Sequence, residues 1–360
     1  MGNRIITWVT AIVALGFLVS GFSIGIDPRT SIVLAVFSMT FPVWIILMLV
    51  LTVGCVVVKN RHGGLISLIA WIIGFYNVFS IMPFNVGASE HADDTTLKVM
   101  SYNVFRFWVG DSTDLSQGNP TLNSVINSGA DIVVLQESIP IRPNKKLGIM
   151  AHQCDTLKQL YPYSNISGDG QALLSKYAFT TVSLPEKASG SAQFAAYSIS
   201  LNDTLQLCLI NVHLQSFRLN SAERKAYYEF TDGEVSKSSL KEARQKILPK
   251  VKKALRSHAE EAEMLVRNVD AVWPEGMLIL CGDFNDITDS YPMKILCRDC
   301  RLNDAFRKAS FGPMATYHVS RFYFNIDHIL YRGLSTPIDY RRLKVPASDH
   351  YPVLATFVLN

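Results

Sequence analysis

The chain has 360 residues, which leaves room for one domain of two to three hundred residues and a smaller second part. Its formal net charge of +4 is no evidence for the concentrated basic face that marks a nucleic-acid binder, so composition alone selects no partner. Charge is unevenly distributed, since residues 1–84 carry very little of it and the remainder has the composition of a soluble protein.

Three long apolar stretches fill the N-terminal part of the chain, at about Ile5–Ile26, Thr30–Val58 and Leu65–Phe84. Each approaches or exceeds the roughly 20 residues that cross a bilayer core, and none has a charged residue in its interior. A signal peptide would be a single short stretch, and a soluble domain of this size has nothing to cover such runs all round. We therefore predict three transmembrane helices in residues 1–84.

Basic residues next to these stretches predict their orientation. Arg4 precedes the first stretch and Lys59, Arg61 and His62 follow the second, whereas the loop Asp27–Arg29 is balanced in charge. Positive residues favour the cytoplasmic side, so the residues after the third stretch are expected outside. The protein is thus predicted to be a multi-pass protein of the cytoplasmic (inner) membrane with a periplasmic or otherwise extracytoplasmic domain. If one of the three stretches does not span the membrane, the predicted side of the C-terminal domain is reversed.

Residues 85–96 are small and polar and are predicted to form a linker, after which short β-branched runs predict strands of a soluble domain. A helix is expected at Leu122–Ser128. The predicted strands are Lys98–Val104, Asp131–Gln136, Ala172–Ser175, Ala195–Leu201, Leu205–Leu214, Met277–Cys281, Ile326–Tyr331 and Val353–Val358. Among the cysteines, Cys297 and Cys300 have CxxC spacing without a second Cys or His pair nearby, which argues against zinc and leaves a local disulfide open.

A long charged segment, residues 221–270, separates the fifth and sixth predicted strands and has helical spacing of its apolar residues. We interpret it as an insertion of two solvated helices with one buried stripe. The alternative is a basic lip for an anionic substrate, formed by Lys246, Lys250, Lys252, Lys253 and Arg256.

Polar residues gather at or just after the predicted strand ends. Taken singly each has an ordinary explanation, such as a solvated glutamate, a hydrogen-bonded structural histidine or an Asx turn. Their coincidence in one domain favours a site. Asn211 and His213 are two residues apart and therefore point to one face of a strand. The set supplies oxygen ligands and imidazoles without a thiolate, which suits Mg²⁺, Mn²⁺ or Ca²⁺ better than zinc, and Mg²⁺ suits phosphoester hydrolysis.

The order of these motifs resembles that of the endonuclease/exonuclease/phosphatase superfamily, which includes DNase I-like nucleases, inositol polyphosphate 5-phosphatases and neutral sphingomyelinases. The matching segments are SYNV (101–104), LQE (135–137), NVHL (211–214), GDFN (282–285), IDHI (326–329) and SDHYPV (348–353). The resemblance implies an α+β fold, a four-layer α/β/β/α sandwich of two mainly antiparallel sheets, for the catalytic domain 97–360. It places the site at one edge of the sheets.

The resemblance also implies roles for residues near a metal ion. Glu137 matches the metal-binding glutamate, with Asn103 and Asp349 expected close to the same ion. Asp283 matches the aspartate that orients or deprotonates the attacking water, helped by Asn285.

Further roles concern the phosphate group. His350 matches the histidine that binds the scissile phosphate, and Asp327 matches the carboxylate that holds this histidine and its charge. His213 matches a second histidine, a candidate acid for the leaving oxygen, and Asn211 is expected to orient phosphate or metal ligands.

The function that follows is hydrolysis of phosphoester bonds, dependent on Mg²⁺ with Mn²⁺ as an alternative, by a membrane-tethered domain. The substrate is left open among a nucleic acid, a phospholipid head group and a small phosphoester. One alternative is an extracytoplasmic endonuclease or exonuclease. Gln193 and Asn325 weaken it, because relatives that cut DNA carry basic residues at such positions. The other alternative is a catalytically silent membrane-bound binding module, which predicts the loss of at least one motif residue.

Overall fold

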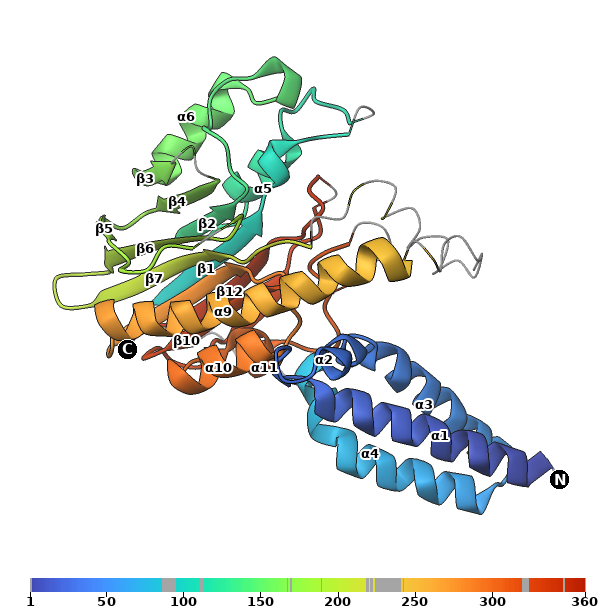
Figure 1. The fold of residues 1–360 in the computed structure, drawn as a ribbon. Coiled ribbons are helices and arrows are strands. Elements are labelled where there is room, and N and C mark those ends of the chain that lie inside the picture. The colour runs from blue at the N-terminus through green and yellow to red at the C-terminus, as the bar shows by residue number, and fades with distance from the viewer. Residues whose placement is uncertain are drawn as a thin grey trace.

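The computed structural model describes residues 2–85, 95–110, 113–166, 168, 170–188, 190–217, 220, 223, 241, 243–318, 324–345 and 347–359. A bundle of helices extends from a domain built on two sheets (Figure 1). Most of the predicted linker and the first part of the predicted helical insertion lie outside the described residues.

Four helices form the N-terminal bundle: α1 (Gly2–Ser23), α2 (Ile32–Ser38), α3 (Phe41–Val57) and α4 (Arg61–Ile81). Helices α1 and α4 are each long and apolar enough to cross a membrane, and α2 with α3 adds a third span if this pair, bent by 55°, counts as one. The predicted second stretch is therefore not one continuous helix. Its break precedes Pro42, because proline has no amide hydrogen to donate and disfavours the helical conformation of the residue before it.

Several small and polar side chains lie inside the bundle beside a small apolar core, and many large apolar side chains face outwards. Ser20, Ser67 and Asn77 are buried, whereas Trp8 is 71% exposed and Ile72 is 67% exposed. Close approach of helices through small residues is typical of packing in lipid, where the surroundings are as apolar as leucine. The surface of the bundle is thus suited to hydrocarbon rather than to water.

Two six-stranded sheets form the centre of the second part of the structure, and both have the same pattern of strand directions. Each contains one parallel pair, β1–β2 or β7–β8, and is otherwise antiparallel. In spatial order, the first sheet is β11 (Asp339–Arg342), β12 (Val353–Val358), β1 (Thr96–Asn103), β2 (Ile132–Gln136), β4 (Gln171–Ser175) and β3 (Tyr163–Ile166). The second is β5 (Phe179–Val182), β6 (Gln193–Ser200), β7 (Gln206–His213), β8 (Met277–Asp283), β10 (Asp327–Arg332) and β9 (Asn303–Asp304).

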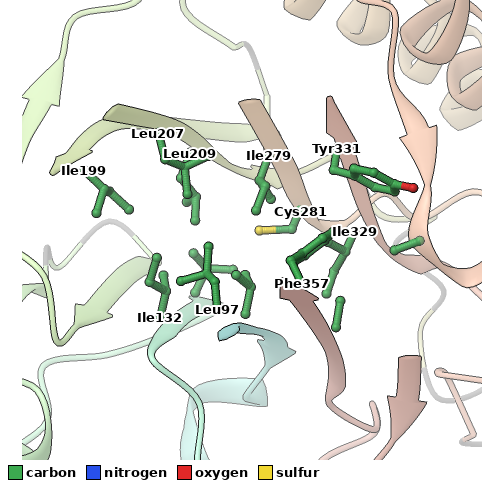
Figure 2. Packing of buried hydrophobic residues seen from close by; sticks show 14 of the residues in the cluster. Leu97, Ile132, Ile199, Leu207, Leu209, Ile279, Cys281, Ile329, Tyr331 and Phe357 are labelled. Atoms are coloured by element: carbon green, nitrogen blue, oxygen red, sulfur yellow. The ribbon is translucent and has the colours of Figure 1, made fainter. Parts of the chain in front are cut away.

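The sheets pack face to face through an apolar core, in which Leu97 and Ile132 of one sheet meet Leu209 and Ile279 of the other (Figure 2). The outer face of the first sheet is covered by α5 (Pro120–Ile126) and α6 (Ala151–Leu160). That of the second is covered by α9 (Leu248–Val272) and α10 (Tyr291–Asp299). The predicted α+β fold, a four-layer α/β/β/α sandwich preceded by apolar helices, is confirmed.

Strands that are buried on both faces follow the predicted bounds closely, and the strands that sequence analysis missed lie at the sheet edges. Strands β3, β5, β9 and β11 are short or partly exposed and lack a continuous apolar run. The described part of the predicted insertion is one long helix, α9, which starts after a π-helical turn at Ala243–Ile247. Cys297 and Cys300 are free thiols, so the disulfide left open by the sequence does not form.

Gly282, the first residue of the GDFN motif, is required by the close approach of β7. It has φ +152°, and a Cβ at this position would lie 1.8 Å from the Val212 carbonyl oxygen. We expect Gly282→Ala to lower the free energy of unfolding by more than about 3 kcal/mol, because neither backbone can yield within the parallel pair.

Thermal unfolding of the purified full chain in detergent measures this effect. The matched control is Gly129→Ala, where φ is +69° but no atom lies within 4 Å, so the expected loss is about 1 kcal/mol. Equal losses in the two variants would contradict the steric explanation.

Candidate active site

The register of the second sheet brings three predicted site residues to one end of it. His213 of β7 pairs with Asp283 of β8, and Asp283 pairs with Asp327 of β10. Paired residues of neighbouring strands direct their side chains to the same face. In the first sheet Asn103 pairs with Gln136, the residue before Glu137. The two parallel pairs therefore end where the predicted side chains lie.

One hydrogen bond joins the two sheets inside this site. Asn103 Nδ2 donates to Asp283 Oδ2 across 3.0 Å and lies 3.4 Å from Glu137 Oε1. Its Oδ1 accepts a hydrogen bond from the Phe105 amide at 3.1 Å, which fixes the orientation of the amide group. The Glu137 side chain is 33% exposed, so it faces the open side of the site.

A histidine between two carboxylates forms the buried part of the site. His350 Nδ1 lies 2.9 Å from Asp327 Oδ2, and His350 Nε2 lies 3.6 Å from Asp283 Oδ2. Burial alone would lower the pKa of His350, but the charges of Asp327 and Asp283 and the hydrogen bond that His350 donates to Asp327 outweigh it and raise this pKa to about 10. His350 is therefore an imidazolium at neutral pH.

His213 lies near one of these carboxylates, that of Asp283, and near Glu137. Its Nε2 is 3.9 Å from Asp283 Oδ2 and 4.0 Å from Glu137 Oε1. Although the side chain is buried, neither ring nitrogen has a hydrogen-bond partner among the described residues. Buried polar atoms are rarely left in this state, which indicates a position for a ligand atom or water.

Asn285 and Asp349 lie at the margins of this cluster. The Asn285 amide donates to the Leu214 carbonyl oxygen at 3.0 Å, and its backbone N–H donates to Asp283 Oδ1 at 2.9 Å. Both Glu137 and Asn285 have positive φ, 51° and 48°, a backbone state that clusters at functional sites. The Asp349 charge contributes to the raised pKa of His350, so this carboxylate is close to the cluster.

Asn211 faces the inner side of its strand as predicted, but its amide group is engaged between the sheets. Its Nδ2 donates to the Leu135 carbonyl oxygen at 3.0 Å, and its Oδ1 accepts from Gln136 Nε2 at 2.7 Å. The side chain is fully buried. The structure therefore places Asn211 two residues inside the sandwich, behind His213, where it ties the sheets together and supports the site.

The donor atoms of this site fit a divalent metal ion. Carboxylate oxygens of Asp283 and Asp327 lie within 4.8 Å of each other and of a ring nitrogen of His350, which as an imidazolium would face the phosphate and not the ion. Asp327 Oδ1 has no hydrogen-bond partner among the described residues, and the partly exposed Glu137 carboxylate is on the same side. Carboxylate and amide oxygens are the ligands that hard cations such as Mg²⁺ prefer.

Residues 100–350 match the model of the Endonuclease/Exonuclease/phosphatase family. The chain belongs to this family. Residues 3–81 match a domain of unknown function. A search of curated proteins finds no match.

The chain is similar to several solved structures. A truncated TDP2 from Caenorhabditis elegans has 18% identity, with 73% of this chain and 98% of that chain covered and a TM-score of 0.47. A family protein from Bacteroides thetaiotaomicron has 16% identity, with 74% and 99% covered and a TM-score of 0.44. The human Nocturnin catalytic domain has 18% identity, with 74% and 94% covered and a TM-score of 0.45.

A buried hydrogen-bond network on α9, which the sequence motifs do not predict, holds the loops after β7 and β8. His258 Nδ1 lies 3.1 Å from Asp286 Oδ2, and His258 Nε2 lies 2.6 Å from the Gln215 carbonyl oxygen. The Gln215 N–H donates to Glu261 Oε2 at 3.0 Å. The only signals in the sequence are the His258–Glu261 spacing on one helix face and the position of Asp286 directly after Asn285.

His258 is charged in this network. A carbonyl oxygen and a carboxylate only accept hydrogen bonds, so both ring nitrogens must carry hydrogens. Burial alone would lower the pKa of His258, but the hydrogen bond to Asp286 and its charge raise it overall. The imidazolium thereby links the loop that follows His213 to the loop that follows Asp283.

Variants of Asn211 and His213 test which of the two residues stabilises the fold and which serves only the site. Asn211→Leu is expected to lower the free energy of unfolding by about 2–4 kcal/mol, because the Leu135 carbonyl and the Gln136 amide lose their partner in the core. His213→Ala is expected to change it by less than about 1 kcal/mol, because its ring makes no hydrogen bond to the described residues. Denaturant titration of both variants measures this difference, and the opposite ranking would contradict it.

His258→Gln is expected to destabilise the fold by about 3 kcal/mol, because it removes one partner of a buried charge pair. A pKa raised by folding stabilises the protonated form, so the contribution is fully present below the unfolded pKa of about 6.5 and is lost as the pH rises through the folded value. The free energy of unfolding, measured at several pH values, should differ less between the variant and wild type as the pH rises. The control is His152→Gln on the exposed face of α6, which should show no such trend.

Proposed function

We propose that this protein hydrolyses phosphoester bonds with the help of a divalent metal ion, Mg²⁺ or Mn²⁺, while its N-terminal helices hold it in a membrane. The observation that carries the proposal is the buried cluster of Asp283, His350 and Asp327, joined across the sheets to Asn103 and Glu137. It offers a base, a fixed positive charge and metal ligands within one site.

Glu137 is the primary candidate to hold the metal ion, with Asn103 and Asp349 beside it. When bound, the ion would polarise a phosphoryl oxygen and offset the charge that develops on it. The hydrogen bond from Asn103 to Asp283 sets the distance between this metal-binding side and the carboxylate that acts on water.

Asp283 is placed to orient the attacking water and to accept its proton. One carboxylate oxygen accepts from the Asn285 N–H and the other from Asn103, so the group is fixed before substrate binds. Asn285 acts by holding this loop against the end of β7.

The two histidines are suited to different tasks. His350 is a permanent imidazolium fixed by Asp327, so it would bind the scissile phosphate and stabilise its developing charge. His213 has ring nitrogens without hydrogen-bond partners among the described residues, so it would pass a proton to the leaving oxygen. Asn211 would contribute by positioning β7 rather than by contact with substrate.

The arrangement of the bundle supports an extracytoplasmic position of the domain. Asn60 Nδ2 donates to the Asn3 carbonyl oxygen at 3.0 Å, so the start of α1 and the start of α4 lie together. They lie at the end far from the sheets (Figure 1). Arg4, Lys59 and Arg61 are gathered there, and positive residues favour the cytoplasm. The domain at the other end would then lie in the periplasm or outside the cell.

Asp283→Asn and His350→Ala are each expected to lower turnover by at least about 10²-fold, because each removes a group that acts in the transition state. Initial rates of bis-p-nitrophenyl phosphate hydrolysis by the full chain in detergent, with Mg²⁺, measure this. The matched control is Asp203→Asn, an exposed aspartate in the turn between β6 and β7, which should retain full activity.

Two outcomes would overturn the proposal. Near-normal turnover in either site variant would contradict the role assigned to the replaced residue. Wild-type protein that hydrolyses no phosphoester with Mg²⁺ or Mn²⁺ would instead support the catalytically silent binding module.

A further inference from the structure

The loop between α1 and α2 is clamped to the helices that cover the second sheet. Lys294 Nζ of α10 donates to the Ile24 carbonyl oxygen at 2.7 Å. The Arg29 guanidinium bonds to Glu263 of α9 and donates to the Tyr291 hydroxyl at 3.1 Å. These contacts come from two helices of the domain, so the loop is fixed in direction as well as in place.

The end of α4 makes a second, separate contact. Arg307 donates to the Tyr76 hydroxyl at 3.0 Å and to Asp289 Oδ1 at 2.7 Å, and its guanidinium lies over the Tyr76 ring. Phe84, just after α4, pairs with Phe311 of the domain. Two contacts on different helices of the bundle prevent the domain from swinging as it would on a flexible tether.

The segment held against the bundle is the one that leaves the active site. A cavity of about 20 Å³ is lined by Asp286, Ile287 and Ser290 on the domain side and by Gly25 and Met39 on the bundle side. Asn285 immediately precedes this segment. The segment that follows Asn285 therefore lies against the end of the bundle nearest the domain, which is where apolar helices would leave the hydrocarbon layer.

Helix α9 adds a basic surface at the same level. Leu255 lines the cavity against α2, and the residues before it extend beyond the sheets toward the side on which the bundle lies (Figure 1). Residues 243–259 contain six Lys and Arg and no Asp or Glu. Lys253 and Arg256 are exposed and Lys252 is partly exposed. Each basic residue at an anionic lipid surface is worth about 1 kcal/mol.

We propose that the substrate is the phosphoester of a lipid in the bilayer that holds the bundle, and that the start of α9 lies on its anionic head groups. This proposal rests on the proposed function. The contacts between the bundle and the domain keep the site at the head-group level, where lipid phosphate is present at a high effective concentration. A nucleic acid would be repelled by the same anionic surface.

The reaction is a hydrolysis that needs no further reactant. Water forms the new bond to phosphorus and gives its proton to Asp283, while the bond from phosphorus to the leaving oxygen breaks. That oxygen receives a proton from protonated His213. Return of the proton from Asp283 to His213, whose Nε2 lies 3.9 Å from Asp283 Oδ2, restores both groups, so that water is divided between the two products.

The test uses the full chain in nanodiscs of phosphatidylethanolamine and phosphatidylglycerol with Mg²⁺. Mass spectrometry follows loss of these lipids and formation of their hydrolysis products, with bis-p-nitrophenyl phosphate and a single-stranded oligonucleotide as soluble arms. We expect kcat/KM for the lipids to exceed that for either soluble substrate at least about tenfold. The Asp283→Asn protein sets the background.

A charge variant tests the surface on α9. Lys252→Gln, Lys253→Gln and Arg256→Gln together should lower lipid hydrolysis at low salt by about 10-fold or more relative to hydrolysis of the soluble diester by the same variant. The matched control replaces the exposed Lys158, Lys187 and Arg341 by glutamine, which should change neither rate.

The outcomes separate the two proposals. Hydrolysis of the soluble diester without lipid hydrolysis, or faster hydrolysis of the oligonucleotide, would overturn the lipid substrate and leave the proposed function intact. Hydrolysis of none of the three would overturn both. An unchanged lipid rate in the charge variant would overturn the part assigned to α9.

Discussion

The structure depends on how one buried carboxylate, that of Asp283, is compensated. Removing an ionised carboxylate from water is costly unless charges and hydrogen bonds replace the water. Here the first sheet supplies the Asn103 amide, the following loop supplies the Asn285 N–H, and the C-terminal motif supplies the His350 imidazolium. Since these groups come from distant segments, the carboxylate can be buried only in the complete sandwich. Burial of this carboxylate thus depends on correct docking of the two sheets.

Sequence alone predicts the centre of this fold better than its edges, for a physical reason. Central strands such as β2 and β4 are buried along their whole length and therefore consist of continuous apolar runs that can be recognised. Edge strands such as β5 and β11 have exposed and half-buried positions, and only their hydrogen bonds to a neighbouring strand make them strands. Those bonds depend on the register of the whole sheet, which no local pattern contains.

In the site, too, local sequence patterns predict some features, whereas others depend on how the elements pack. The alternation of a strand correctly predicts that Asn211 and His213 face the same way, but not which of them reaches the open end. Asn211 is paired across the sandwich with Gln136, while His213 is the last residue of β7 and faces the carboxylates. His258 was unrecognised because its partner Asp286 lies in a loop that only the packing of α9 on the second sheet brings near. Motif order predicts which residues meet, whereas the supporting network depends on how a helix crosses a sheet.

The segment from Asp283 to Ser290 connects the candidate site to the helical bundle. At its start it carries the carboxylate of the site, in its middle Asp286 bonds to His258, and at its end Ser290 lines the cavity against the bundle. Asn285 and Asp289 have positive φ, a backbone state that permits few alternative conformations. The apolar helices thus contact the segment that follows Asp283 and Asn285, so the bundle and the candidate site share one stretch of backbone.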